Sequence, residues 1–142
     1  MKALREYIEQ AVRESGKIPM DHVYIDTPPP TDWDGVAYLV IEHGVTAMTP
    51  IVNDGAAPQT TPVRIYSVST DQWESEQLCR QVAKAVESKI NEWAQASDCP
   101  IVGMVENGPM AYSEDMSSSR VDSTHKQLIS EMNFNVIHHI NL

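Results

Sequence analysis

The feature that most constrains this chain is a long one-sided helix, which the sequence predicts from Gln72 to about Ala96. Its apolar residues recur at helical spacing and form a stripe about 100° wide, as in helices that lie on a sheet. The stripe contains Leu78, Val82, Val86, Ile90 and Trp93, and it is widened by Cys79, Ala83 and Ala94. Thr70 or Asp71 is the expected N-cap. Of the tryptophans in this region, both Trp73 and Trp93 are expected in the core between helix and sheet.

Alternating and apolar segments predict the strands of that sheet. In Leu128–Leu142, the residues Leu128, Met132, Phe134, Val136, His138 and Ile140 face one way and polar residues face the other. This pattern indicates a half-buried strand. Val36–Ile41 is apolar on both faces, as is typical of a central strand. Val63–Thr70 supplies a further strand, and His22–Ile25 and Ile101–Val105 are expected to be short ones.

The N-terminal segment predicts a second helix, because Leu4, Tyr7, Ile8, Ala11 and Val12 recur along one helical face. Gly16 is suited to end it, and Pro19 prevents its resumption. The expected fold is therefore α+β, with a mostly antiparallel sheet of about four to five strands packed by the N-terminal helix and the long central helix. A length of 142 residues fits a single domain over residues 1–142.

Two connections stand out as candidate contact segments. Residues 44–62 are rich in Thr, Pro, Gly and Ala and are long for a loop inside a compact domain. A protruding hairpin that orders against a partner is the preferred interpretation, with contacts from Met48, Pro50, Ile51 and Val52; the alternative is an insertion without a role. Ser113–Asp122 is polar and rich in serine and is expected to be mobile, and its acidic residues Glu114, Asp115 and Asp122 are candidates for an exposed functional surface.

Charge and cysteine content narrow the class of protein. A net charge of −10 repels phosphate and disfavours a general nucleic-acid binder. The negative charge either keeps the protein soluble or forms a surface that repels DNA, so that DNA moves past it without binding. Cys79 and Cys99 lack metal-ligand spacing, and Cys79 is expected to be a buried free thiol, as in a protein kept in a reducing cytoplasm. No apolar run is long enough for a membrane span, and the charged N-terminus is unlike a signal peptide.

No pattern in the sequence predicts catalysis, a cofactor or a metal site. His138 and His139 are adjacent on a predicted strand and point to opposite faces, and the other histidines have no ligand spacing. Asp122, Ser123 and His125 are close in sequence but lack a nucleophile elbow. No phosphate-binding glycine loop is present. The chain is therefore not expected to be an enzyme, although a small enzyme whose site converges around His125 and His138 is kept as an alternative.

The order of these elements resembles the tail terminator proteins of long-tailed bacteriophages, also called tail completion or tail-to-head joining proteins. The segment Val63-Arg64-Ile65-Tyr66-Ser67-Val68-Ser69 runs into a polar turn and the helix that starts at Asp71-Gln72-Trp73-Glu74. The long alternating strand within Gln127–Leu142 then closes the chain, as it does in that family. The resemblance extends over nearly the whole sequence.

The resemblance implies a structural virion protein at the junction of tail and head, made in the host bacterial cytoplasm. Copies would form a ring, typically of six, on the end of the tail tube. The ring would stop tube polymerisation and provide the surface for the head-tail connector protein, while DNA passes through its lumen without specific binding. Met48, Pro50, Ile51 and Val52 would contact a neighbouring subunit or the tube. Glu114, Asp115 and Asp122 would line the lumen or the head-facing side.

Two further functions are compatible with the same sequence. A head closure protein, which also belongs to the phage neck, would bind the portal side instead of the tail tube. A monomeric adaptor of bacterial origin would form no ring under any condition.

Overall fold

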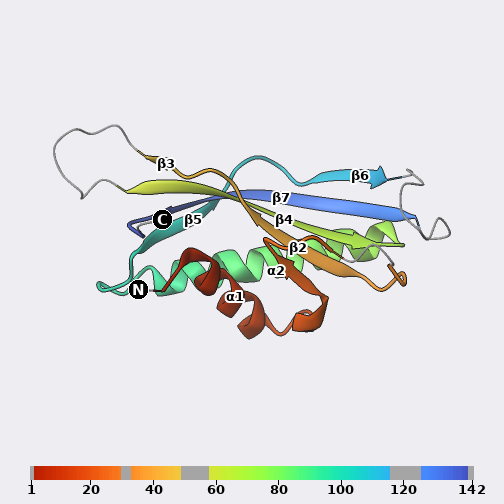
Figure 1. Cartoon of the computed structure of the whole chain (residues 1–142), viewed down its shortest axis with the longest axis horizontal. Coiled ribbons are helices and arrows are strands. Elements are labelled where there is room, and N and C mark those ends of the chain that lie inside the picture. Colours follow the sequence, from red (N-terminus) through yellow and green to blue (C-terminus); the bar gives the residue numbers. More distant parts are fainter. Residues whose placement is uncertain (1, 30–32, 49–57, 116–125, 141–142) are drawn as a thin grey trace.

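Two long antiparallel strands, β4 (Gln59–Ser69) and β7 (Gln127–His138), form the centre of the sheet. The computed structural model describes residues 2–29, 33–48, 58–115 and 126–140, and within these ranges the fold is α+β (Figure 1). Strand β2 (Tyr38–His43) lies beside β4, and β1 (Val23–Ile25), which follows a short 3₁₀ turn at Met20–His22, lies beside β2. On the other side of β7 lies β5 (Ile101–Glu106), which gives the order β1-β2-β4-β7-β5.

Two short strands extend this order and were not expected from the sequence. Strand β3 (Ala47–Met48) pairs with the start of β4, and β6 (Ala111–Asp115) pairs with the start of β7. The described residues therefore form seven strands: five in the main order, within the expected four to five, and the two short additional ones. All pairs are antiparallel except β1 with β2. The segment 44–62 is also shorter as a connection than predicted, because β4 already begins at Gln59.

Local signals place both helices. Helix α1 spans Leu4–Ser15 and ends at Gly16, whose φ of 63° is the left-handed conformation that glycine adopts without strain. Helix α2 spans Gln72–Trp93, and the Asp71 carboxylate accepts a hydrogen bond of 2.8 Å from the Glu74 backbone N–H. This is the predicted N-cap. Neither α1 nor α2 is long and apolar enough to cross a membrane.

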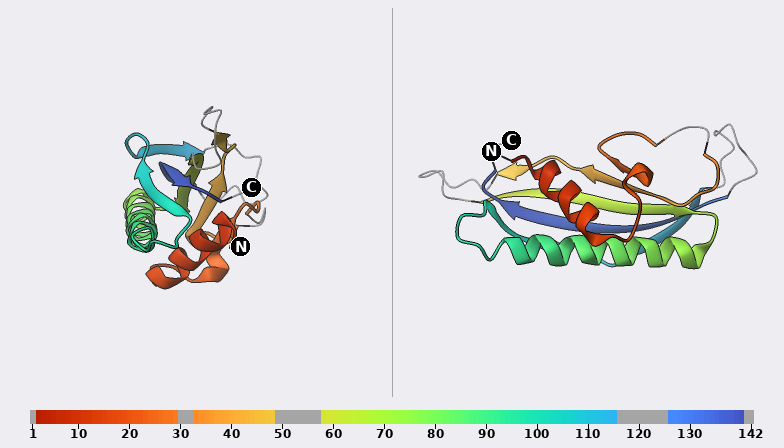
Figure 2. Two further views of the ribbon diagram at one scale, coloured as in Figure 1. Left: turned by 90° about the vertical axis from the view of Figure 1, so that its left-hand side faces the viewer. Right: turned by 90° about the horizontal axis from the view of Figure 1, so that it is seen from below.

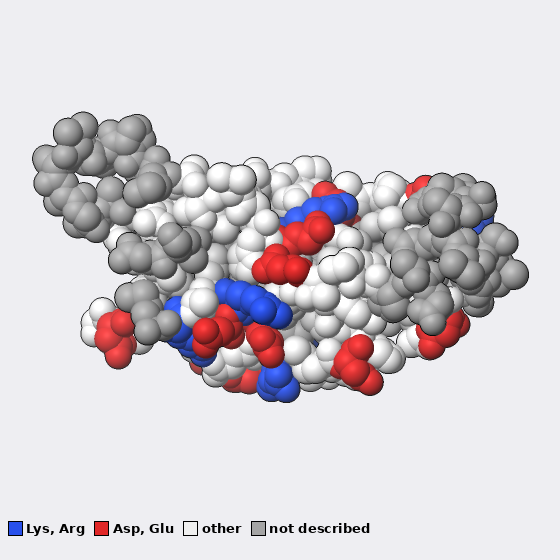
Figure 3. All heavy atoms as spheres, viewed as in Figure 1, with Lys and Arg blue, Asp and Glu red and all other residues white. Residues whose placement is uncertain are grey.

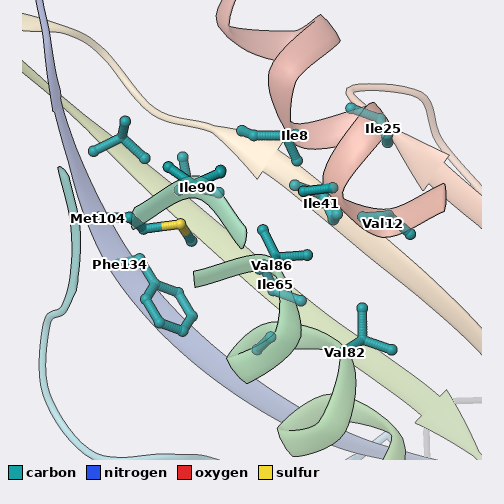
Figure 4. Close-up of a cluster of buried hydrophobic side chains, with 14 of the residues drawn as sticks. Ile8, Val12, Ile25, Ile41, Ile65, Val82, Val86, Ile90, Met104 and Phe134 are labelled. Atoms are coloured by element: carbon teal, nitrogen blue, oxygen red, sulfur yellow. The ribbon is translucent and has the colours of Figure 1, made fainter. Parts of the chain in front are cut away.

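Both helices cover the same face of the sheet (Figures 1 and 2). The main core fills the space between them and the strands (Figure 4). Its largest buried side chains come from α1, α2 and the four strands β2, β4, β5 and β7: Leu4, Ile8, Val12, Leu39, Ile41, Ile65, Ile90, Ile101, Met104 and Phe134. The alternation predicted for the last strand is confirmed, since Met132, Phe134 and Val136 are buried while Glu131, Asn133 and Asn135 are only half-buried.

The apolar strand β2 is buried on both faces, as predicted. Leu39 and Ile41 join the main core, whereas Tyr38 and Val40 belong to a second cluster on the face without helices. Trp33 and Val68 complete that second cluster. Val36, predicted to start the strand, instead precedes it and is largely exposed.

The prediction for Trp73 is wrong. Its side chain is 69% exposed, while Trp93 is partly buried against the main core with its ring 6.2 Å from that of Tyr7. The buried side of α2 is set by Ser75, Cys79, Val82, Val86 and Ile90. Trp73 lies two residues before Ser75, about 200° around the helix, and therefore points away from the sheet.

Candidate functional site

An ion network occupies the middle of the sheet face that carries no helix. Arg64 on β4 binds Glu42 on β2 at 2.9 Å and Glu131 on β7 at 2.5 Å. Asn133 donates a hydrogen bond of 2.9 Å to Glu131, and the Arg64 guanidinium lies 4.3 Å from the ring centre of Tyr66. Burial opposes the charge of Glu131, but the hydrogen bonds from Asn133 and Arg64 outweigh it and lower the pKa of this carboxyl. These contacts join three neighbouring strands on one face.

Charged side chains are otherwise sparse over the strands in the view of Figure 3, and most of them gather over the helices. Toward β1, the helix-free face is aromatic. The ring of Tyr38 meets Trp33 at 5.7 Å and Tyr24 at 5.8 Å, both nearly edge to face. Trp33 also donates a hydrogen bond of 2.6 Å from Nε1 to the Val36 carbonyl. Trp33 and Tyr38 are themselves buried, at 5% and 4% exposed, so these rings form a small second core on this face beside the Arg64 network.

The sheet also ends in edges without a neighbouring strand in the described part of the chain. On edge strand β5, Val102 and Val105 are 53% and 49% exposed. Edge strands of monomeric proteins usually carry charges or prolines that discourage pairing. Strand β5 has features of this kind: Glu106 at its end, Pro100 directly before it, and a register shift between Ile101 and Gly103.

The residues proposed as contact sites from the sequence lie far apart in the fold. Met48 lies on β3, opposite Gln59, at the end of the sheet where β7 finishes. Glu114 and Asp115 lie opposite the first residues of β7, at the other end. Both acids, expected in a mobile segment, belong to strand β6. Their strand is short and polar, so periodicity did not reveal it. Pro50, Ile51, Val52 and Asp122 lie outside the described residues.

Sequence reasoning missed a carboxylate–imidazole pair. Asp26 follows β1 with a left-handed φ of 54°, and its carboxylate accepts a hydrogen bond of 2.9 Å from the His43 backbone N–H and contacts His43 Nδ1. The pair lines a cavity of about 240 Å³ together with Gly44, Thr46, Thr61 and the first turn of α1. No sequence signal marks this pair, because only the parallel pairing of β1 with β2 brings the two residues together.

The environment of His43 favours a structural role for this pair. Its Nε2 is shielded from solvent and has no hydrogen-bond partner among the described residues. A general base must reach the proton that it removes, and Nε2 has almost no accessible surface in this arrangement. The pair instead fastens the end of β1 to the end of β2.

His138 is also held in a structural hydrogen-bond chain. Its Nδ1 accepts the Ile140 backbone N–H at 3.0 Å, so Nε2 carries the proton and donates it to Thr61 Oγ1 at 2.7 Å. Thr61 in turn lies 2.8 Å from the Thr46 hydroxyl. A histidine whose Nε2 donates to this hydroxyl cannot act as the base that activates it. His138 is therefore not placed to act as the base of the alternative site around His125 and His138, and His125 lies outside the described residues.

The cysteines are free, as predicted, and Cys79 is buried. Burial raises the pKa of the Cys79 thiol to about 12, which keeps it protonated and unreactive. Within the described ranges, no three His, Cys, Asp or Glu side chains are grouped closely enough to hold a metal ion. Among the described residues, the helix-free face and the sheet edges are candidate contact surfaces.

Comparison with known proteins adds no further constraint, since no family model matches the sequence and no curated protein matches it.

Proposed function

We propose that this chain is a phage tail terminator: a structural virion protein that forms a ring, typically of six copies, on the end of the tail tube. The ring stops tube polymerisation and presents the surface to which the head-tail connector protein docks. The DNA passes through its lumen without specific binding. The site of action is the virion, after synthesis in the bacterial cytoplasm.

One observation carries this proposal: both helices lie on one face of the sheet. In the described part of the chain, no helix covers the other face and no further strand pairs with the two edges. A sheet with exposed valines on an edge strand favours contact with another chain over isolation in solvent. The order of helix, strands, long helix and long closing strand agrees with the resemblance drawn from the sequence.

The connection between β3 and β4 is the proposed contact to a neighbouring subunit or to the tube. Its base is the antiparallel pair of β3 with β4, where Ala47 lies opposite Thr60 and Met48 opposite Gln59. Pro50, Ile51 and Val52 would add apolar contacts beyond this base. Glu114, Asp115 and Asp122, with the general excess of acidic residues, are proposed for the lumen or the head-facing side, where negative charge keeps DNA from sticking.

A binding experiment separates this function from that of a head closure protein. The purified chain is mixed with assembled tail tubes and, separately, with portal rings of the same phage, and each mixture is sedimented. A tail terminator sediments with the tubes at a small and saturable ratio, because only tube ends bind it. Binding to the portal alone would assign the chain as a head closure protein. Binding to neither would contradict a role at the head–tail junction.

A further inference from the structure

We propose that Asn107 is a site of spontaneous covalent modification, at which the backbone nitrogen of Gly108 converts the asparagine to aspartate or isoaspartate. The inference concerns the chain by itself and goes beyond the proposed function. It rests on the pair Asn107-Gly108 in an exposed turn, on two reacting groups that the fold leaves unrestrained, and on the contrast with the other described asparagines.

The turn belongs to the connection between β5, which ends at Glu106, and β6, which begins at Ala111 (Figure 1). Both Asn107 and Gly108 are exposed. The Asn107 backbone N–H donates to the Asn133 carbonyl on β7 at 2.8 Å, which holds the main chain at the end of the ladder. Among the described residues, however, neither the Asn107 side-chain amide nor the Gly108 N–H makes a hydrogen bond. Both reacting groups are therefore unrestrained.

Gly108 gives its nitrogen an open approach to the Asn107 side chain. Its φ of 92° lies in the left-handed region, and a Cβ built on it would meet no other described part of the molecule within 4 Å, its chain neighbours aside. A glycine has no side chain beside its N–H and adopts many backbone conformations. The nitrogen can therefore reach Cγ of Asn107. Asn107 is the only asparagine in the sequence that precedes a glycine.

The reaction is an intramolecular displacement that consumes only water. The Gly108 nitrogen loses its proton to a base in solution and attacks Cγ of Asn107, forming an N–C bond. The C–N bond of the side-chain amide breaks, and its nitrogen leaves as ammonia, so a cyclic succinimide remains. Water then opens the ring at one of its two carbonyl groups. One opening gives aspartate, and the other gives isoaspartate, in which the main chain runs through Cγ.

The fold restrains the other described asparagines. The Asn91 side chain on α2 donates to the Met104 carbonyl at 2.8 Å and accepts the Met104 N–H at 2.8 Å. The Asn133 side chain donates to Glu131 at 2.9 Å. Asn135 lies within β7, between β4 and β5, where the ladder holds the backbone N–H groups. Each of the three precedes a residue with a side chain that hinders attack by its nitrogen: Glu92, Phe134 and Val136.

Either product changes the charge at the end of β5. Each adds a carboxylate next in the chain to Glu106, which contacts the Lys84 ammonium on α2. Lys84 also binds Glu87 at 2.9 Å, so two carboxylates already share one ammonium group at this place. The added negative charge is therefore not compensated by these neighbours.

Isoaspartate also changes the main chain. It lengthens the connection between β5 and β6 by one methylene group, directly after the N–H that donates to the Asn133 carbonyl. Both strands pair with β7, so this connection determines how the two strands are placed along their common partner. An aged preparation of the chain is therefore a mixture of three forms that differ in charge or in the length of this turn.

The test follows the purified full chain by peptide mapping and mass spectrometry during incubation at neutral and at mildly alkaline pH. We expect the first modified peptide to contain Asn107, as a pair of aspartate and isoaspartate products that elute separately. The rate should rise with the hydroxide concentration, because the attacking nitrogen must first lose its proton. Asn107→Gln is the matched control. Its longer side chain must close a larger ring, so its modification should be slower by about tenfold or more.

Incubation of the same chain in guanidinium chloride separates the effect of the fold from that of the sequence. An exposed turn reacts without unfolding, so the rate at Asn107 in the folded chain should lie within about tenfold of the rate in denaturant. Three outcomes would overturn the inference: an unmodified Asn107 in the folded chain, a folded rate far below the rate in denaturant, or equal modification of Asn107→Gln. None of them bears on the proposed function, because the assay contains neither tubes nor portal rings.

Discussion

His138 illustrates how single residues in this chain connect elements that are distant in sequence. It lies on the last strand, yet its imidazole binds the Thr61 hydroxyl on β4 and, through it, Thr46 before β3. The alternation of β7 predicts that His138 is buried, but the identity of its partners depends on the pairing of β4 with β7. The same holds for Asp26 and His43, whose contact requires the parallel pair of β1 and β2. Single-residue geometry of this kind is set by tertiary structure and is not visible in sequence patterns.

Replacement of His138 tests its structural role. His138→Ala leaves the Thr61 hydroxyl and the Ile140 N–H without a buried partner and opens a cavity, so we expect a loss of about 2–4 kcal/mol in the free energy of unfolding. Urea denaturation measures this loss. The neighbouring exposed His139→Ala serves as the control and should change stability by less than about 0.5 kcal/mol. Equal effects of the two substitutions would contradict the assignment.

The same residue predicts a pH dependence. Burial, followed by the nearby His139, lowers the pKa of His138 below its ordinary value. The unfolded chain therefore binds a proton here more readily than the folded one, so this residue contributes stability that is present near neutral pH and is lost on acidification below the unfolded pKa of about 6.5. Unfolding free energies at pH 7 and pH 5 should differ less in His138→Ala than in the wild type. An unchanged difference would exclude His138 as its source.

At the scale of elements, sequence periodicity locates the structures whose apolar faces meet the core. Helices α1 and α2 and strands β2 and β7 agree closely with expectation, because each carries a regular apolar pattern. Sequence periodicity does not predict β3 and β6, because both strands are short. It also does not predict the early start of β4, because Gln59–Pro62 has no apolar repeat. Trp73 was assigned to the core by its residue type, although the phase of the α2 stripe already places it on the opposite side.

The two tryptophans of α2 form a matched pair for testing that helix. Trp73→Ala removes a side chain that is 69% exposed, and we expect the unfolding free energy to change by less than about 0.5 kcal/mol. Trp93→Ala removes packing against Tyr7 and the core, and about 2 kcal/mol should be lost. Chemical denaturation of both variants provides the comparison. A larger loss for Trp73→Ala would mean that α2 is rotated about its axis.

At the scale of the whole molecule, the sheet separates a packed side from an open side. Both helices lie on one face of the sheet (Figure 2). The main core lies on that face, and the aromatic cluster and the Arg64 network lie on the other. The sequence predicts the packed side well, since burial requires regular apolar patterns. It predicts the open side poorly, because contacts such as that of Arg64 with Glu42 and Glu131 join three strands and follow only from their register.

The connection between β3 and β4 allows a test of assembly that spares the fold. Deletion of the wider segment 46–59 would remove β3 and the hydrogen bond from Thr46 to Thr61. Replacement of residues 50–57 by a short Gly-Ser linker keeps both. We expect this variant to unfold at nearly the same urea concentration as the wild type but to lose binding to tubes in the sedimentation assay. A variant that still binds tube ends would remove this connection from the contact surface.

The most direct test of the central claim is the length of tail tubes assembled with and without this chain, measured by electron microscopy. Tail-tube subunits are allowed to polymerise while the chain is added at increasing ratios. Our account predicts that tubes become shorter as the ratio rises and that a ring is visible at one end of each tube. Tubes that keep the same length distribution at every ratio, with bare ends, would contradict the assignment of this chain as a terminator.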